Sequence, residues 1–168
     1  TSLQVKNAIV DLQKATFGER SNICINNPYL IIHLHMHDNQ AVLSLQSTVE
    51  SLHKRGYRPS LGNAPLKENL AAGLMKITEW DGSIPLMDIM CGSGTFLIEG
   101  VSNALNIPNI KKNYLFKNWL DFNESIYNQE LAKIQNNASR KQNFSKVIGC
   151  EIDREVFLQA KNNISLSG

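Results

Sequence analysis

The chain has 168 residues, a formal net charge of +2 and a hydrophobic fraction of 42%. This composition is that of a globular protein, and the length allows one domain or a small module joined to part of a larger one. No apolar run approaches the roughly 18 residues of a membrane span, so we expect no membrane partner.

The first part of the chain, residues 1–50, predicts a small α/β unit. Apolar residues between positions 5 and 12 fall on one face of a short helix. Residues 29–37 then alternate in the manner of a half-buried strand. Residues 38–40 indicate a hairpin turn into a second strand over residues 41–46. We therefore expect a helix followed by a hairpin.

Residues 51–63 are polar and basic, and they predict a linker between two units. Within this stretch Lys54, Arg55 and Arg58 accompany the aromatic Tyr57. Cations combined with an aromatic ring are typical of contacts to single-stranded RNA. A solvated linker explains the same residues equally well, so both interpretations remain open.

Residues 64–168 alternate between helical and strand patterns, which predicts a parallel sheet with crossover helices and an α/β fold. The expected elements are a helix from residue 65 with Leu66, Leu70, Leu74 and Ile77 on one face, a buried strand over 84–89, a helix over 95–105, a helix over 126–138, a strand over 147–150, and a last helix to residue 164 with Asp153 as its N-cap.

Residues 88–95 connect the first expected strand to the helix that follows it. Gly92 and Gly94 lack side chains where a ligand would approach the backbone, and the helix begins with free N–H groups. In open α/β sheets this strand end is the usual ligand crevice. The carboxylate of Asp88 suits the positively charged amino end of a ligand better than a phosphate, which points to a methionine-type zwitterion.

An acidic residue at the tip of the next strand would complete such a site by binding a ribose diol. Glu151 has this place, although it lies 63 positions after Asp88 rather than the usual separation of about 20 residues. An insertion between the helix and the second strand explains the difference. The alternative, an ordinary tight glycine turn, is disfavoured by this combination. We expect Glu99, on the helix after the loop, to be exposed or to cap a neighbour.

Three blocks of sequence, residues 52–58, 64–72 and 88–99, resemble the THUMP-linked RNA methyltransferases in this order. The resemblance extends to the bacterial large-subunit rRNA guanine-N2 methyltransferases, which are often labelled putative adenine-specific DNA methylases. The resemblance implies the last part of an RNA-binding THUMP domain at residues 1–50. It implies the first half of a Rossmann-like, S-adenosylmethionine-dependent methyltransferase domain at residues 64–168.

The same resemblance implies which residues contact the cofactor. The loop would hold the methionine end, and the acidic segment after the second strand would hold ribose and adenine. The residues are Pro65, Leu66, Lys67, Asp88, Met90, Cys91, Gly92, Ser93, Gly94, Thr95, Glu151, Ile152 and Asp153.

The sequence departs from the family in two ways. The THUMP-like part begins in mid-domain, and no Asn/Asp-Pro-Pro-Tyr/Phe catalytic motif follows Glu151. Because positioning of the target amine is much of the catalysis, we assign no catalytic residue and expect an inactive fragment that carries the cofactor half. A DNA adenine-N6 methyltransferase and a non-catalytic RNA- or cofactor-binding remnant are the alternatives.

We expect no metal and no disulfide scaffold. His33, His35 and His37 share one face of the expected strand, but the nearby residues do not complete a set of ligands. The three cysteines are few and widely spaced. This usage favours the reducing cytoplasm. The family resemblance implies RNA, and large-subunit rRNA in particular, as the partner.

Overall fold

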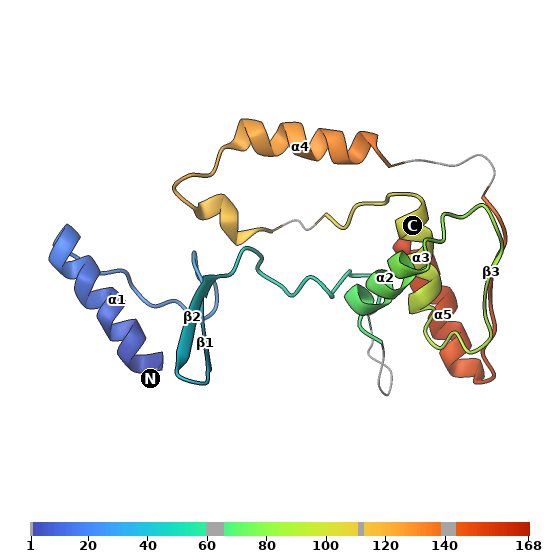
Figure 1. The fold of residues 1–168 in the computed structure, drawn as a ribbon, viewed down its shortest axis with the longest axis horizontal. Coiled ribbons are helices and arrows are strands. Elements are labelled where there is room, and N and C mark those ends of the chain that lie inside the picture. Colours follow the sequence, from blue (N-terminus) through green and yellow to red (C-terminus); the bar gives the residue numbers. More distant parts are fainter. Residues whose placement is uncertain (1, 60–65, 111–112, 139–143) are drawn as a thin grey trace. The chain divides into compact units, whose positions relative to one another are not determined.

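The computed structural model describes residues 2–59, 66–110, 113–138 and 144–168 (Figure 1). It divides the chain into unit 1, which comprises Thr1–Val49 and Asn113–Phe122, and unit 2, which comprises Glu50–Lys112 and Asn123–Gly168. Unit 1 therefore includes a short segment from the middle of the sequence. None of the helices in the described part of the chain combines the length and the apolar character that crossing a bilayer requires.

Unit 1 contains the predicted helix and hairpin. The helix α1 spans Ser2–Phe17, and the strands β1 (Ile32–His37) and β2 (Gln40–Leu45) pair antiparallel. Asp38 and Asn39 both have positive φ, at 44° and 20°. A two-residue turn of this hand requires such angles, and Asp and Asn tolerate them better than most residues.

The mid-sequence segment of unit 1 is attached to the end of the hairpin. Its short 3₁₀ helix η1 spans Leu115–Asn118. The backbone N–H groups of Leu115 and Phe116 donate to the Ser47 carbonyl at 2.9 and 3.2 Å, and Leu115 is buried. The Phe116 ring lies 4.9 Å from the Tyr114 ring. The segment thus adds apolar cover to unit 1.

Unit 2 has the predicted α/β architecture around two parallel strands. The strand β3 (Leu86–Asp88) pairs with β4 (Val147–Gly149) in parallel. The helices are α2 (Glu68–Ile77), α3 (Thr95–Ala104), α4 (Glu124–Asn136) and α5 (Arg154–Ser167). Helix α3 is central, because α2, α5 and both strands pack against it.

Helices α2 and α3 lie side by side and approach closely at Gly100 (Figure 1). A Cβ atom at Gly100 would lie 2.9 Å from Met75 Cε, so glycine is what admits the Met75 side chain there. Ala71 and Met75 are the buried apolar residues of α2, at 0% and 6% exposure. The contact with α3 therefore runs along these two residues.

The apolar face predicted for α2 was wrong for three of its members, because α3 contacts the adjacent face instead. These are Leu70, Leu74 and Ile77, which are 51%, 40% and 79% exposed. The stretch predicted as a buried strand over residues 84–89 also exposes three of its apolar side chains, those of Ile84, Met87 and Ile89. A parallel sheet is normally covered on both faces, and in the described residues α3 packs on the strands without covering these side chains.

The predicted cap of the last helix is confirmed. Asp153 Oδ1 accepts hydrogen bonds from the N–H groups of Glu155 and Val156, at 2.8 and 3.2 Å. This arrangement satisfies free donors of the first turn of α5. Because only residues 150–153 separate β4 from α5, the cap also fixes where the acidic segment after β4 turns.

Candidate functional site

The candidate site begins at the loop between β3 and α3. Gly92 and Gly94 have φ of 53° and 81°, a region that residues with a Cβ rarely adopt. A Cβ at Gly94 would contact Ala160 of α5 at 3.6 Å, whereas a Cβ at Gly92 would meet nothing within 4 Å. The backbone at Gly92 therefore borders open space, and a ligand could approach it there.

Backbone hydrogen bonds continue the pairing of β3 and β4 into this loop. The Cys150 N–H donates to the Asp88 carbonyl, and the Cys91 N–H donates to the Cys150 carbonyl, both at 2.8 Å. Gly149 permits this approach, because a Cβ there would lie 2.6 Å from Leu97 Cδ1 and 3.0 Å from Cys91 Sγ. The ends of the two strands are therefore held together at one edge of the sheet.

Two carboxylates border the loop at this edge. Glu151 Oε2 accepts a hydrogen bond from the Gly92 N–H at 3.0 Å, and its Oε1 accepts from the Asp153 N–H at 2.9 Å. Asp88 Oδ1 accepts from the Met90 N–H at 3.1 Å. The structure thus brings Asp88, Gly92 and Glu151 together, although 63 positions separate the two acids.

The electrostatic environment of the loop is negative. Burial raises the pKa of the Cys91 thiol, and the carboxylates of Asp88 and Glu151 raise it further. A field that disfavours a thiolate favours a cation, such as an ammonium or sulfonium group. The arrangement therefore suits a positively charged ligand at the ends of β3 and β4.

The remaining predicted cofactor residues are placed less uniformly. Met90 and Ile152 have exposed side chains, at 80% and 102%, and would contact a ligand only from the rim. Leu66 and Lys67 immediately precede α2, and Lys67 is its N-cap residue. Pro65 lies outside the described residues.

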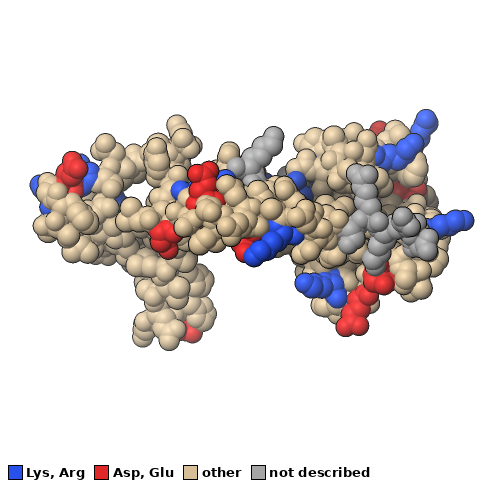
Figure 2. Space-filling model, turned by 90° about the horizontal axis from the view of Figure 1, so that it is seen from above, with Lys and Arg blue, Asp and Glu red and all other residues tan. Residues whose placement is uncertain are grey.

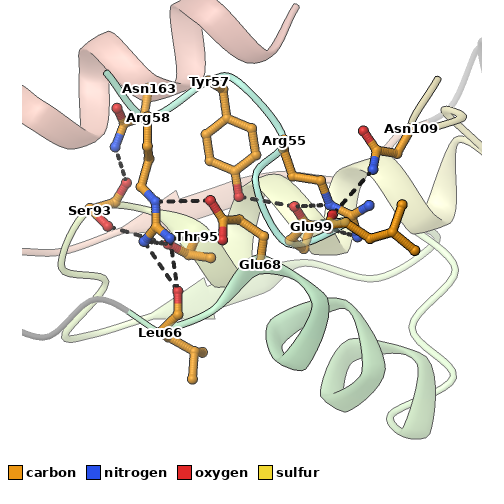
Figure 3. A network of polar contacts seen from close by, with 11 residues as sticks. Arg55, Tyr57, Arg58, Leu66, Glu68, Ser93, Thr95, Glu99, Asn109 and Asn163 are labelled. Carbon is orange, nitrogen blue, oxygen red and sulfur yellow. Dashed lines mark hydrogen bonds and ion pairs between the residues drawn. The ribbon is translucent and has the colours of Figure 1, made fainter. Parts of the chain in front are cut away.

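Segment 55–58 makes a buried polar network with α2 and α3 (Figure 3). Arg55 and the Tyr57 hydroxyl both donate to Glu99 of α3, with the Tyr57 bond at 3.0 Å. The ion pair between Arg55 and Glu99 measures 3.2 Å, and Glu99 is 4% exposed. The expectation that Glu99 is exposed was therefore wrong, because two donors from a distant segment compensate for its burial.

The neighbouring Arg58 forms an ion pair with Glu68 at 2.9 Å, in which both side chains are 5% exposed. A solvated linker therefore does not describe Tyr57 or Arg58. Of the four residues considered for RNA contact, Arg55, Tyr57 and Arg58 are engaged within unit 2, and Lys54 is exposed. Sequence reasoning identified neither Glu68 nor Asn163; Asn163 Nδ2 donates to the Ser93 carbonyl, 70 positions away.

The described residues contain no group of three or more His, Cys, Asp or Glu side chains that could hold a metal ion. In the hairpin, His37 contacts Asp38 at 3.1 Å, and both side chains are exposed. His33 Nε2 instead lies within hydrogen-bonding distance of Gln46 Oε1.

Comparison with known proteins places the chain among methyltransferases. Residues 55–168 match the family model described as "RMKL-like, methyltransferase domain". A Synechocystis sp. protein named "Putative RNA methyltransferase slr0064" is 43% identical over 165 residues, which are 97% of this chain and 43% of that protein. The ribosomal RNA large subunit methyltransferase K/L of Vibrio campbellii is 36% identical over 171 residues, covering 99% of this chain and 24% of that protein.

A solved structure agrees with these matches. The crystal structure of SMU.472, described as "a putative methyltransferase complexed with SAH", has a TM-score of 0.81 and 28% identity, and covers 99% of this chain and 44% of that chain. The chain thus spans less than half of the length of each of these proteins. Because the family model matches from residue 55 to the last residue, the chain belongs to the RMKL-like methyltransferase domain family.

Proposed function

We propose that this chain is the S-adenosylmethionine-binding part of an RNA methyltransferase that modifies the N2 amine of guanine in large-subunit rRNA. The carrying observation is that Asp88 and Glu151, at the ends of adjacent parallel strands, border a glycine loop with open space in front of Gly92. The names of the relatives support RNA, and rRNA in particular, as the substrate class.

The residues present fit this cofactor. Asp88 and Glu151 supply negative charge and acceptors for an amino group and a ribose diol, and the first N–H groups of α3 face the carboxylate end. When bound, S-adenosylmethionine supplies a methyl group on a positively charged sulfur. The proposed contacts are Pro65, Leu66, Lys67, Asp88, Met90, Cys91, Gly92, Ser93, Gly94, Thr95, Glu151, Ile152 and Asp153.

We further propose that residues 1–50 are the last part of a THUMP domain, residues 51–63 a connection, and residues 64–168 the first half of the methyltransferase domain. The helix and hairpin of unit 1 support the first assignment. Acidic side chains lie among the basic ones on the face drawn in Figure 2. At the connection we propose RNA contact for Lys54, because its side chain is exposed, whereas Arg55 and Arg58 are paired with Glu99 and Glu68.

In the family that the sequence resembles, an Asn/Asp-Pro-Pro-Tyr/Phe motif positions the target amine. No Asn/Asp-Pro-Pro-Tyr/Phe motif occurs between Glu151 and Gly168. We propose that these 168 residues bind the methyl donor without transferring its methyl group. A methylation assay on rRNA and on DNA with labelled cofactor tests this directly. Transfer to rRNA would overturn the inactivity, and transfer to DNA adenine would overturn the substrate assignment as well.

Calorimetry with S-adenosylhomocysteine tests the cofactor site. Asp88→Asn keeps an acceptor for the Met90 N–H but removes the charge, so we expect at least tenfold weaker binding with an unchanged melting temperature. Asp11→Asn, on the exposed surface of α1, is the matched control and should bind normally. Equal affinity in Asp88→Asn and the unsubstituted chain would contradict the proposed site.

A further inference from the structure

The guanidinium group of Arg58 joins three separate acceptors. Its Nε and NH2 atoms lie 3.2 and 2.9 Å from the two oxygens of Glu68, the first residue of α2. NH1 and NH2 donate to the Leu66 carbonyl at 3.1 and 3.2 Å, and NH1 also donates to Thr95 Oγ1 at 3.3 Å. One buried side chain thus links the start of α2 to the start of α3.

The contact with Thr95 continues into the glycine loop. Thr95 Oγ1 lies 3.3 Å from Ser93 Oγ, within hydrogen-bonding distance. The Ser93 carbonyl in turn accepts a hydrogen bond from Asn163 Nδ2 of α5 at 3.0 Å. Thr95 and Asn163 are each 4% exposed. A continuous chain of polar contacts therefore runs from α2 through Arg58 and the loop to α5 (Figure 3).

The geometry requires an arginine. Five N–H donors in a fixed plane can serve a carboxylate, a carbonyl and a hydroxyl together, whereas a lysine ammonium has three donors around one atom. Lysine at position 58 could keep the ion pair with Glu68 but could not hold the Leu66 carbonyl and Thr95 in the same arrangement. The contact with the loop is thus separable from the charge pairing.

A second arginine of the same segment provides an internal comparison. Arg55 pairs with Glu99, which lies four residues after Thr95 and so one turn further along the same face of α3. Its Nε and NH2 atoms donate to the two oxygens of Glu99, which lies on α3 beyond the loop. Arg55 and Arg58 therefore share their segment and their kind of partner, but differ in the helix that carries the carboxylate and in the link to Ser93.

We infer that Arg58 is a positioning residue for the cofactor, acting through Thr95 to hold the glycine loop at a fixed place relative to the start of α2. The inference rests on the proposed function, because it concerns the same loop. Arg58 itself does not touch the cofactor. Its loss should weaken cofactor binding even where the fold is retained.

The test measures binding of S-adenosylhomocysteine by calorimetry, with melting temperatures recorded for each variant. We expect about tenfold weaker binding for Arg58→Lys, the size of one lost hydrogen bond to a charged group, and little change in affinity for Arg55→Lys. Thr95→Val removes only the bridging hydroxyl and leaves both ion pairs. The double variant should bind no more weakly than the weaker single variant, because both changes break one link.

Several outcomes overturn the inference. They are unchanged affinity in Arg58→Lys, an equal loss in Arg55→Lys, and additive losses in the double variant. Absence of binding by the unsubstituted chain would instead overturn the proposed function, and this inference with it.

Amide hydrogen exchange in the ligand-free chain gives the same comparison without a ligand. Faster exchange at residues 92–97 in Arg58→Lys than in Arg55→Lys is expected. Equal exchange in the two variants would also count against the inference.

Discussion

The side chain of Glu151 holds the backbone of Gly92, through a hydrogen bond of 3.0 Å between residues 59 positions apart. The residue expected to bind the ribose therefore also orders the loop expected to bind the methionine end. An acid at this place would perform two tasks. Its two oxygens accept the N–H groups of Gly92 and Asp153, and each oxygen can accept a further hydrogen bond from a ligand. The two halves of the site are coupled before any ligand arrives.

This coupling predicts a large effect of removing the Glu151 carboxylate. Glu151→Ala should weaken S-adenosylhomocysteine binding about 10- to 100-fold, because hydrogen bonds to a charged group contribute about 1.5–3 kcal/mol. Calorimetry measures the affinity. Glu155→Ala, four residues further on and exposed, serves as the control. Similar affinities in the two variants would show that Glu151 does not contribute to the site.

The close packing at Gly149 predicts a loss of stability on adding a single methyl group. Gly149→Ala places a Cβ 2.6 Å from Leu97 and 3.0 Å from Cys91 Sγ, so overpacking should lower the free energy of unfolding by about 1–3 kcal/mol. The matched exchange at Gly73, within α2, meets nothing within 4 Å. Gly73→Ala should raise stability by about 0.5–1 kcal/mol, because alanine favours the helix. Urea unfolding measures the free energy of unfolding of both variants. Equal changes in the two variants would contradict the close packing of Gly149 against Leu97 and Cys91.

The cap of α5 predicts a difference between two substitutions of Asp153. Asp153→Ala removes the acceptor for Glu155 and Val156, which should lower the free energy of unfolding by about 1 kcal/mol. Asp153→Asn retains a capping oxygen and should change it little. Thermal unfolding followed by circular dichroism measures both. A loss of the same size in Asp153→Asn would mean that charge, rather than the cap, is what stabilises the helix.

The environment of Cys91 predicts slow alkylation. Burial and the neighbouring Asp88 and Glu151 raise the pKa of its thiol, so less of the reactive thiolate is present at a given pH than for an ordinary cysteine. The stability that the neutral thiol contributes is present at neutral pH and is lost as pH rises through the raised pKa. Cys24 and Cys150 are exposed.

Peptide mapping after iodoacetamide treatment at several pH values measures the rates. Cys91 should react last and gain rate only at alkaline pH, and the difference should disappear in urea. Preferential modification of Cys91 at neutral pH would contradict this account.

Local patterns in the sequence predicted most of the helices and strands. Helical spacing, a hairpin turn at Asp38 and Asn39, the cap at Asp153 and the glycine loop each depend on a few adjacent residues, and each appears in the structure. The parallel pairing of β3 with β4 followed from the alternation of helix and strand patterns. Such features are encoded within about one or two turns of chain.

Features that depend on distant partners were not predicted. Tyr57 and Arg55 reach Glu99 across 42 and 44 positions, so nothing near Glu99 indicates that it is buried. The contact face of α2 depends on Gly100 of α3, and apolar spacing within α2 alone selected the wrong stripe. In both cases tertiary contacts decide between local alternatives.

The ion pairs of segment 55–58 have a consequence for a polyanion approaching the protein. A lysine or arginine that neutralises a phosphate of the nucleic acid releases counterions. Each phosphate neutralised in this way adds about −0.7 to −0.9 to the slope of log affinity against log salt concentration. Lys54, Arg55 and Arg58 would suggest three such contacts. The latter two already face Glu99 and Glu68, so their charges are internally compensated. In a salt titration of RNA binding, segment 54–58 should therefore contribute to the slope as one phosphate contact, that of Lys54, and not as three.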